Sequence, residues 1–100
     1  MNQLRYSEQA KKDLVQIRRY LTKESGSKEV ARRFLAKLRQ QCQQVATLPG
    51  MMGRARPELF EGVRSLPYGN YIILFRYNND FVEIVSIIEG HRDIEELFRP

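Results

Sequence analysis

The sequence predicts an α+β fold in which an antiparallel β-sheet carries an N-terminal helical hairpin on one face. Two runs rich in β-branched and aromatic residues, 71–77 and 81–88, are separated by Asn78-Asn79-Asp80, which is the pattern of a β-hairpin. Ahead of them, apolar residues recur at helical spacing over two stretches of roughly 20 residues each. Helices followed by a group of strands in one short chain are typical of an α+β domain.

The length and composition predict one ordinary domain over residues 1–100, because a chain of this size can bury a core of its own. Its longest apolar runs are five residues, far short of the roughly 20 that a membrane span requires. The N-terminus has no secretory pattern, so we expect a cytoplasmic protein without a membrane partner. The single cysteine, Cys42, cannot form an internal disulfide, which agrees with a reducing compartment.

The first helix is predicted to begin at Glu8, after the short extended segment 3–6. Ser7 is a suitable N-cap, because its hydroxyl can accept a hydrogen bond from the first turn. Apolar residues at spacings of 4, 3 and 4 predict its buried face: Ala10, Leu14, Ile17 and Leu21. Gly26 can adopt the left-handed conformation that ends a helix, and Ser27 can cap the next one.

The second helix is predicted from Lys28 to about Thr47, with Pro49-Gly50 as its terminator. Its apolar face consists of Ala31, Phe34, Leu35, Leu38, Cys42, Val45 and Ala46. Because Cys42 lies on this face, we expect a small buried thiol rather than a reactive one. The three-residue connection between the two helices predicts an antiparallel helical hairpin.

The second half of the chain is predicted to form the sheet. After a loop over 51–57 that carries Arg54 and Arg56, a short strand precedes the turn Tyr68-Gly69-Asn70, and the two long strands follow. Neither long strand alternates cleanly between apolar and polar residues, so we expect both faces of the sheet to be covered. A short amphipathic helical turn with Ile94, Leu97 and Phe98 ends the chain.

The register of the two long strands follows if Asn79-Asp80 forms a two-residue turn. Arg76 then lies directly across from Glu83, and the two side chains can form an ion pair. The same register predicts three further cross-strand pairs: Phe75 with Ile84, Leu74 with Val85, and Ile72 with Ile87.

The net charge of +5 is concentrated in the first half of the chain. Residues 1–50 contain eleven Lys/Arg against four Asp/Glu, whereas residues 51–100 contain six against eight. A basic helical half favours an acidic partner or nucleic acid, because its field raises encounter rates with negative surfaces. The alternative is a solvated helix face that binds no particular partner.

The sequence resembles the RelE/ParE toxin superfamily, and the ParE branch most closely. The resemblance spans nearly the whole chain. The matching segments are Ala10-x-x-Asp13-Leu14-x-x-Ile17-x-x-Tyr20, Ala31-x-x-Phe34-x-x-x-Leu38, Pro49-Gly50 with Gly53-Arg54, Glu58-Leu59, Gly62 to Pro67, Asn70 to Arg76, and Gly90-His91-Arg92-Asp93-Ile94.

This resemblance implies a toxin of a type II toxin–antitoxin system, which causes growth arrest and takes part in plasmid or chromosome maintenance. It also implies a small acidic ParD-like antitoxin that wraps the toxin in a hetero-oligomer. ParE-like members bind DNA gyrase, stall it with cleaved DNA and block replication. RelE-like members instead cut messenger RNA on the ribosome, and that endonuclease activity is the alternative function.

The residues present favour the gyrase inhibitor over the nuclease. RNA cleavage needs a base, an acid and cations that stabilise the phosphorane. For a nuclease the candidates would be His91, Arg76, Arg64 and Arg54, but arginine carries protons poorly because it stays charged. His91 is the one side chain here with an unperturbed pKa near neutrality. No lysine follows Lys37 and Phe98 has no hydroxyl, so we expect a protein ligand of gyrase rather than an enzyme.

Two sets of surface residues follow from this interpretation. For the antitoxin we expect an apolar groove between the helical hairpin and the sheet, near Leu14, Ile17, Leu21, Phe34 and Leu38. For the target we expect a surface that contains Arg64, Arg76, His91 and Arg92. One Cys and one His cannot supply the usual four zinc ligands, and no phosphate-binding glycine loop is present, so we expect neither a metal nor a cofactor. A simple nucleic-acid-binding module ranks below both toxin functions, because no recognition motif is present.

Overall fold

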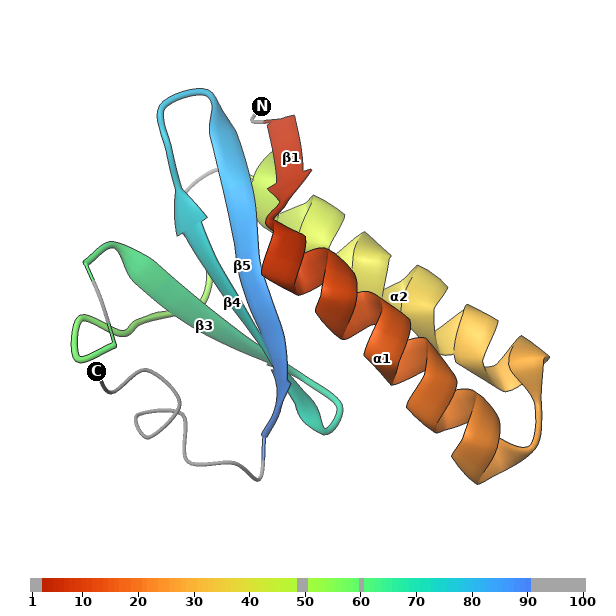
Figure 1. The fold of residues 1–100 in the computed structure, drawn as a ribbon. Coiled ribbons are helices and arrows are strands. Elements are labelled where there is room, and N and C mark those ends of the chain that lie inside the picture. Colours follow the sequence, from red (N-terminus) through yellow and green to blue (C-terminus); the bar gives the residue numbers. More distant parts are fainter. Residues whose placement is uncertain (1–2, 49–50, 60, 91–100) are drawn as a thin grey trace.

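The computed structural model describes residues 3–48, 51–59 and 61–90, and it has the predicted α+β architecture. Five strands and two helices follow one another along the chain: β1 (Gln3–Tyr6), α1 (Glu8–Ser25), α2 (Lys28–Thr47), β2 (Arg54–Ala55), β3 (Val63–Tyr68), β4 (Tyr71–Tyr77) and β5 (Phe81–Glu89). Figure 1 shows α1 and α2 side by side on one side of the sheet. The predicted terminal helical turn and Pro49-Gly50 lie outside the described residues.

The predicted helix ends are confirmed. The hydroxyl of Ser7 accepts a hydrogen bond from the Ala10 N–H at 3.0 Å, and that of Ser27 accepts one from the Val30 N–H at 3.3 Å. Gly26 has φ 69° and donates its N–H to the Thr22 carbonyl at 2.9 Å. These bonds satisfy backbone groups that the helix ends would otherwise leave unpaired.

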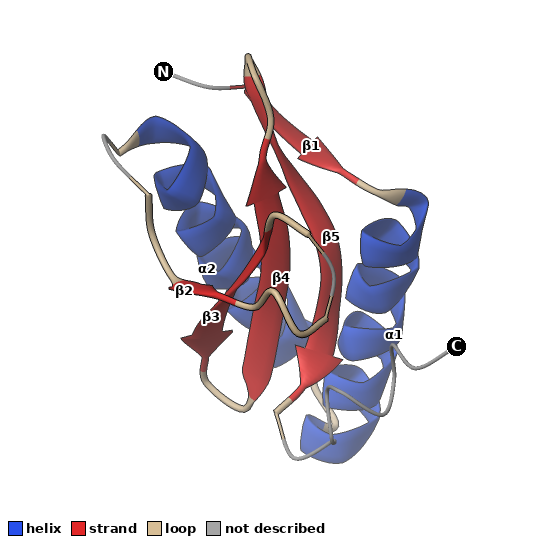
Figure 2. Ribbon diagram, turned by 90° about the vertical axis from the view of Figure 1, so that its left-hand side faces the viewer, coloured by secondary structure: helices blue, strands red, loops and turns tan. Residues whose placement is uncertain are grey.

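The sheet is mixed rather than wholly antiparallel, with the strand order β1-β5-β4-β3-β2. The sequence predicted the antiparallel pairs β3–β4 and β4–β5, and both are present. The difference lies in β1, which pairs in parallel with residues Phe81–Ile84 of β5. Parallel neighbours need a long crossover connection, and here the whole helical hairpin and the rest of the sheet separate the two strands in sequence (Figure 2). The two-residue strand β2 lies where the sequence predicted a loop.

The predicted β4–β5 register is confirmed near the turn and wrong beyond it. Arg76 pairs with Glu83 and Phe75 with Ile84, as expected, but Leu74 lies opposite Ser86 and Ile72 opposite Ile88. Val85 is therefore the extra residue of a β-bulge, which shifts all later pairs by one position.

The start of α1 is bonded to the strand around this bulge. The Ser7 hydroxyl donates to the Val85 carbonyl at 2.6 Å, and the Ser7 N–H donates to the Ile84 carbonyl at 2.9 Å. Asp13, which is buried, accepts hydrogen bonds from the Ser86 hydroxyl at 2.7 Å and the Ile87 N–H at 2.9 Å. Helix α1 thus supplies the partners that the shifted strand lacks.

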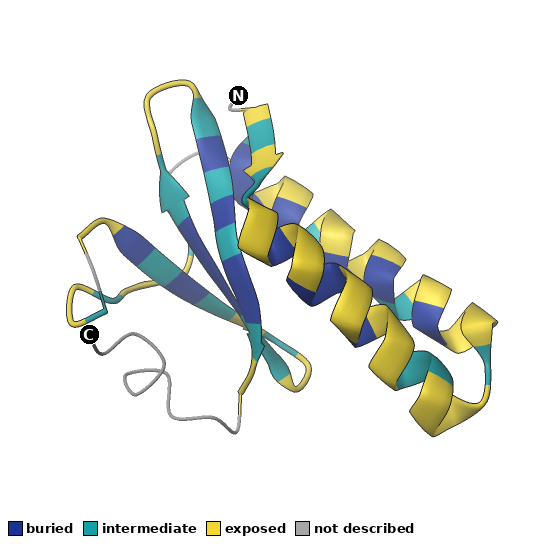
Figure 3. Cartoon of the chain, viewed as in Figure 1, coloured by how far each residue is buried: buried dark blue, intermediate teal, exposed yellow. Residues whose placement is uncertain are grey.

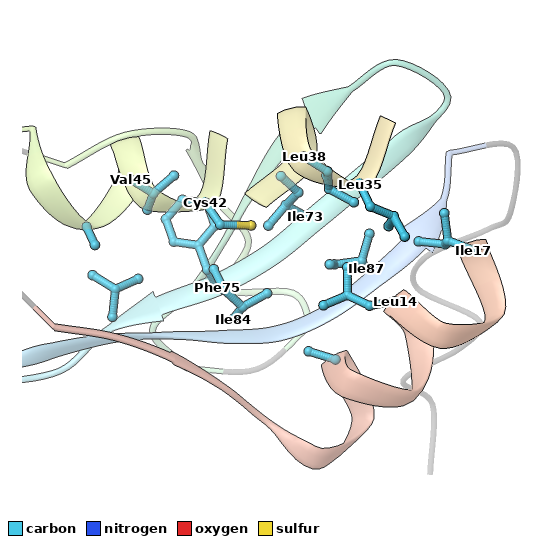
Figure 4. Packing of buried hydrophobic residues seen from close by; sticks show 13 residues of the cluster. Leu14, Ile17, Leu35, Leu38, Cys42, Val45, Ile73, Phe75, Ile84 and Ile87 are labelled. Atoms are coloured by element: carbon cyan, nitrogen blue, oxygen red, sulfur yellow. The ribbon is translucent and has the colours of Figure 1, made fainter. Parts of the chain in front are cut away.

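The core lies between the helices and the sheet. Figure 4 shows side chains from both helices packed against β4 and β5, with Phe75 and Cys42 near the centre. In Figure 3 each helix has one buried stripe that faces the sheet, while its outer side is exposed. The main cluster contains Ala10, Leu14, Ile17, Leu35, Leu38, Cys42, Val45, Ala46, Ile73, Phe75, Val82, Ile84 and Ile87.

The opposite face of the sheet is partly covered as well. Val63, Ser65 and Leu74 are buried outside the main cluster. In Figure 2 the segment that joins β2 to β3 crosses in front of the sheet, on the side away from the helices. This arrangement agrees with the sequence prediction of a sheet covered on both faces.

Candidate functional site

A groove of about 430 Å³ opens between α1 and the end of the sheet. Its floor and walls come from α1, from Phe34 of α2, from the β3–β4 turn and from the last residues of β5. The lining residues are Asp13, Gln16, Ile17, Tyr20, Leu21, Phe34, Gly69, Asn70, Tyr71, Ile87, Ile88 and Glu89. Such a mixture of apolar walls and a few polar groups is typical of a binding site.

Aromatic side chains form one wall of the groove. The Phe34 ring contacts those of Tyr68 and Tyr71, each with 5.7 Å between ring centroids. Tyr20 is 56% exposed at the rim. Partial burial raises the pKa of Tyr71, with smaller contributions from Glu89 and Tyr20, so its hydroxyl stays protonated and available as a donor. Half-buried aromatic residues of this kind commonly carry most of the binding energy in protein interfaces.

The structure divides the five residues that were expected near the antitoxin. Leu21 and Phe34 line the groove and are partly buried, and Ile17 also borders it but is a buried member of the core. Leu14 and Leu38 belong to the packed core, and Leu38 is fully buried. Tyr20 and Tyr71 were not predicted as site residues, although Tyr20 follows Ile17 by one helical turn and could have been placed beside it.

The end of the β5 edge borders this groove. Strand β1 pairs with Phe81–Ile84, and next along the edge Ser7 bonds the Val85 carbonyl and Asp13 accepts the Ile87 N–H. The last residues of the strand, Ile88 and Glu89, line the groove and have no strand partner on this side among the described residues. The groove therefore combines apolar walls with a short end of strand edge, which are the two features that an extended peptide uses when it docks beside a sheet.

The arginines that were expected to meet a target do not share one surface. Directly paired residues in neighbouring strands lie on the same face. Arg64 pairs with Phe75 and therefore lies on the helix face, whereas Arg76 pairs with Val63 and Glu83 on the opposite face. His91 and Arg92 lie outside the described residues.

Arg64 and Arg76 are each held by groups of their own chain. Arg64 donates to the carbonyl of Met52 at 2.7 Å and to that of Gly53 at 2.8 Å, so it secures the loop before β2. Arg76 forms the expected ion pair with Glu83, at 3.0 Å. These contacts give both residues a structural role.

Arg54 and Arg56 lie near Ser65 of β3. Arg54 pairs with Ser65 in the sheet and is exposed. Arg56 donates to the Ser65 hydroxyl at 2.9 Å and forms an ion pair with Glu58 at 3.3 Å. A hydrogen bond from its own backbone N–H, and then the Arg56 guanidinium, lower the pKa of Glu58, so this carboxylate stays ionised. Arg54 is thus an exposed arginine beside an Arg56 whose charge Glu58 balances.

Around Arg54, Arg56, Arg64 and Arg76, the described residues 51–59 and 61–90 contain no histidine or lysine. Arginine does not release its proton near neutrality, and the carboxylates that lie against Arg56 and Arg76, those of Glu58 and Glu83, are held in ion pairs. Burial raises the pKa of Tyr6 and Tyr71, so neither supplies a phenolate. Over the same described ranges, His, Cys, Asp and Glu form no cluster of three or more that could hold a metal ion.

Comparison with known proteins identifies the family of this chain. The family model described as "ParE toxin of type II toxin-antitoxin system, parDE" matches residues 4–94. The chain belongs to the ParE toxin family. Membership implies an antitoxin as partner, because the family is defined by a toxin–antitoxin pair.

Solved structures also match this ParE-family chain. One of them is described as "Chromosomal ParDE TA system from P. aeruginosa", with a TM-score of 0.73 and 23% sequence identity over 89% of this chain and 96% of that chain. At this identity the likeness concerns the fold. Comparison with curated protein sequences gives no match. Among the described residues, neither helix is long and apolar enough to cross a membrane.

Proposed function

We propose that this chain is the toxin of a ParDE pair, that it inhibits DNA gyrase, and that an acidic antitoxin neutralises it by binding the groove between α1 and β5. The observation that carries the antitoxin site is the groove itself, with its half-exposed aromatic wall beside the end of β5. Family membership supports the choice of partner.

An antitoxin segment gains in two ways from this groove. Its apolar side chains bury surface against Leu21, Phe34 and Tyr71, which line the groove and are only partly buried, and this is favourable by roughly 25 cal/mol for each Å² removed from water. Its acidic residues are attracted by the basic first half of the chain, where Lys and Arg outnumber Asp and Glu by seven. Such attraction mainly raises the rate of association and the specificity for an acidic partner.

Gyrase inhibition fits the residues better than RNA cleavage. Arg56, Arg76 and Arg64 are engaged with Glu58, Glu83 and backbone carbonyls, and the described residues 51–59 and 61–90 contain no histidine or lysine. A cleavage site needs both cations and proton transfer, whereas a protein that traps gyrase needs only a complementary surface. We therefore infer that the chain acts as a protein ligand, and RNA cleavage is the outcome that the tests must exclude.

A pair of matched variants tests the groove. Tyr20→Ala removes an aromatic group at the rim that is mostly exposed, so it should change the free energy of unfolding by less than about 1 kcal/mol. It should weaken antitoxin binding by about 2 kcal/mol, or roughly 30-fold, if Tyr20 is an anchor residue. Val30→Ala is the control, because Val30 is 49% exposed and lies outside the groove.

Binding is measured by isothermal titration calorimetry with the antitoxin that is encoded beside the toxin gene. A change of less than threefold for Val30→Ala, together with the large loss for Tyr20→Ala, supports the groove. Equal, small changes for both variants would show that the antitoxin binds elsewhere. Urea unfolding of both variants separates a binding defect from a folding defect.

A further inference from the structure

The side of the helical hairpin that faces away from the sheet has a separate cationic hollow. It has a volume of about 670 Å³ and is lined by Arg18, Arg19, Thr22, Lys23, Lys28 and Arg32. We propose that this hollow, which we call the outer hollow, binds the phosphate backbone of duplex DNA. The proposal concerns a different surface from the antitoxin groove, and it does not depend on gyrase being the target.

The charges of the outer hollow are largely uncompensated. Five of its six lining residues are cations and none is a carboxylate. In the described parts of the chain, Arg32 is the one of these five that forms an ion pair, and its partner is Glu29. The exposed Glu29 carboxylate has its pKa lowered chiefly by the Arg32 hydrogen bond. Close like charges repel one another, and a polyanion relieves that repulsion.

The residue types favour phosphate over an acidic protein segment. No aromatic residue and no aliphatic residue such as Leu, Ile or Val lines the outer hollow, so a peptide would bury few apolar side chains there. The antitoxin groove on the sheet side has both kinds. Arginine guanidinium groups bind phosphate oxygens through paired hydrogen bonds, and phosphate contacts require only cations and donors.

The absence of aromatic lining also favours a duplex over a single strand. Proteins that bind single-stranded nucleic acid stack its bases on aromatic side chains, whereas contacts to a duplex backbone can be purely electrostatic. Thr22 adds no donor to the hollow, because its hydroxyl donates to the Arg18 carbonyl at 2.7 Å.

The cations extend along α1 over a length that suits a duplex. A second, smaller hollow is lined by Glu8, Lys11, Lys12, Val15, Gln16 and Arg19, so Arg19 joins the two. The eleven-residue separation of Lys12 and Lys23 corresponds to about 16 Å along a helix. At about 3.4 Å per phosphate along one strand, this length faces roughly five phosphates.

The position of the outer hollow leaves it accessible. Figure 1 shows the tip of the hairpin, where α1 ends and α2 begins, extending beyond the sheet. In Figure 3 the outer sides of both helices are exposed along their length. A duplex can therefore approach without contacting the groove that holds Tyr20, Phe34 and Tyr71.

The test compares two double variants that remove the same charge. Arg19→Gln/Lys23→Gln removes two cations one helical turn apart on α1, inside the outer hollow. The control, Arg33→Gln/Lys37→Gln, removes two exposed cations with the same spacing on α2, outside it. Binding of a fluorescein-labelled 20-base-pair duplex is followed by fluorescence anisotropy between 50 and 200 mM NaCl, and circular dichroism checks that both variants fold.

Each phosphate contact contributes about 0.9 to the slope of log K against log salt. We expect the α1 variant to lower the magnitude of that slope by about 1.8 and to weaken binding by at least about tenfold at 50 mM salt. The α2 variant should weaken it by less than about threefold, through net charge alone.

Three results would overturn the proposal. Equal losses for the two variants would show that net charge, not the outer hollow, attracts DNA. Tighter binding of a single strand of the same length would contradict a backbone contact to a duplex. Displacement of the duplex by poly-glutamate at equal concentration of charges would assign the surface to an acidic protein instead.

Discussion

Asp13 offers the sharpest test of how the helical hairpin is attached to the sheet. Its carboxylate accepts the Ser86 hydroxyl at 2.7 Å, the Ile87 N–H at 2.9 Å and the Gln9 amide at 2.9 Å. In Asp13→Ala, Gln9 can bond to water because it is exposed. The two donors on β5 are buried with Asp13 and lose a charged acceptor, at about 1.5–3 kcal/mol for each hydrogen bond.

The free energy of unfolding should therefore fall by about 3 kcal/mol, a large share of the roughly 5–15 kcal/mol of a typical domain. Urea unfolding followed by circular dichroism measures this change. With a slope of about 1.5 kcal/mol per M, the midpoint should fall by about 2 M. The control is Glu24→Ala, which removes the same charge from an exposed position of α1 and should cost less than about 0.5 kcal/mol.

A double-mutant cycle with Ser86→Ala isolates the contact between the two side chains. Asp13 and Ser86 share a buried hydrogen bond, so their effects should be less than additive by about 1 kcal/mol or more. A loss below 0.5 kcal/mol for Asp13→Ala, or fully additive effects, would refute the claim that this carboxylate fastens α1 to the bulge.

Three further predictions concern the loop before β2, the cross-strand pair of β4 and β5, and the buried thiol of α2. Gly53→Ala should destabilise the fold by at least about 2 kcal/mol, because Gly53 has φ 74° and a Cβ there would lie 2.6 Å from the Ser65 carbonyl oxygen. The control, Gly26→Ala, has φ 69° but no atom within 4 Å of the added Cβ, so it should cost only about 1 kcal/mol. Urea unfolding measures both costs. A double-mutant cycle of Arg76→Gln and Glu83→Gln should give a coupling of about 0.5–1 kcal/mol, since this cross-strand pair is partly exposed. Burial raises the pKa of Cys42 to about 11, so the thiolate is disfavoured in the folded state and alkylation by iodoacetamide at pH 8 should be on the order of 100-fold slower in the folded protein than in urea.

Each of these predictions has a contradicting result. Equal costs for the two glycine variants would deny the close approach at Gly53. A coupling near zero would remove the structural role of Arg76 and return it to the candidate target surface. Equal alkylation rates in buffer and in urea would show that Cys42 is accessible.

The helices could be predicted almost completely from the sequence, because their signals are local. Ser7, Gly26 and Ser27 end or begin helices where the pattern placed them. The apolar period also predicted the buried stripe, and Cys42 lies on it with no exposed surface. Capping and periodicity depend on neighbours within a few positions, so no knowledge of the rest of the fold was needed.

The parts of the sheet that depend on distant contacts could not be predicted in the same way. The bulge at Val85 is bonded to Ser7 and followed by residues that Asp13 holds, all more than 70 positions away in sequence. The parallel pairing of β1 with β5 likewise joins the two ends of the described chain. Strand β2 has only two residues, which is too short for an alternating pattern to appear.

The candidate site was predicted only in part, again because contacts between distant parts of the chain decide which residues line it. Ile17, Leu21 and Phe34 belong to apolar helix faces, and the sequence cannot say which members of such a face are covered by the sheet and which remain at its border. The opposite faces of Arg64 and Arg76 follow from the β3–β4 register. That register depends on the turn at Gly69, which has φ 58°.

The central claim is that the chain acts on gyrase rather than on messenger RNA. The most direct measurement adds the purified protein to gyrase with supercoiled and with relaxed plasmid, and scores lost supercoiling and trapped cleaved DNA. A parallel reaction with translating ribosomes is probed for cut messenger RNA. The account predicts trapped cleavage with intact messenger RNA, whereas cut messenger RNA with unaffected gyrase would contradict it.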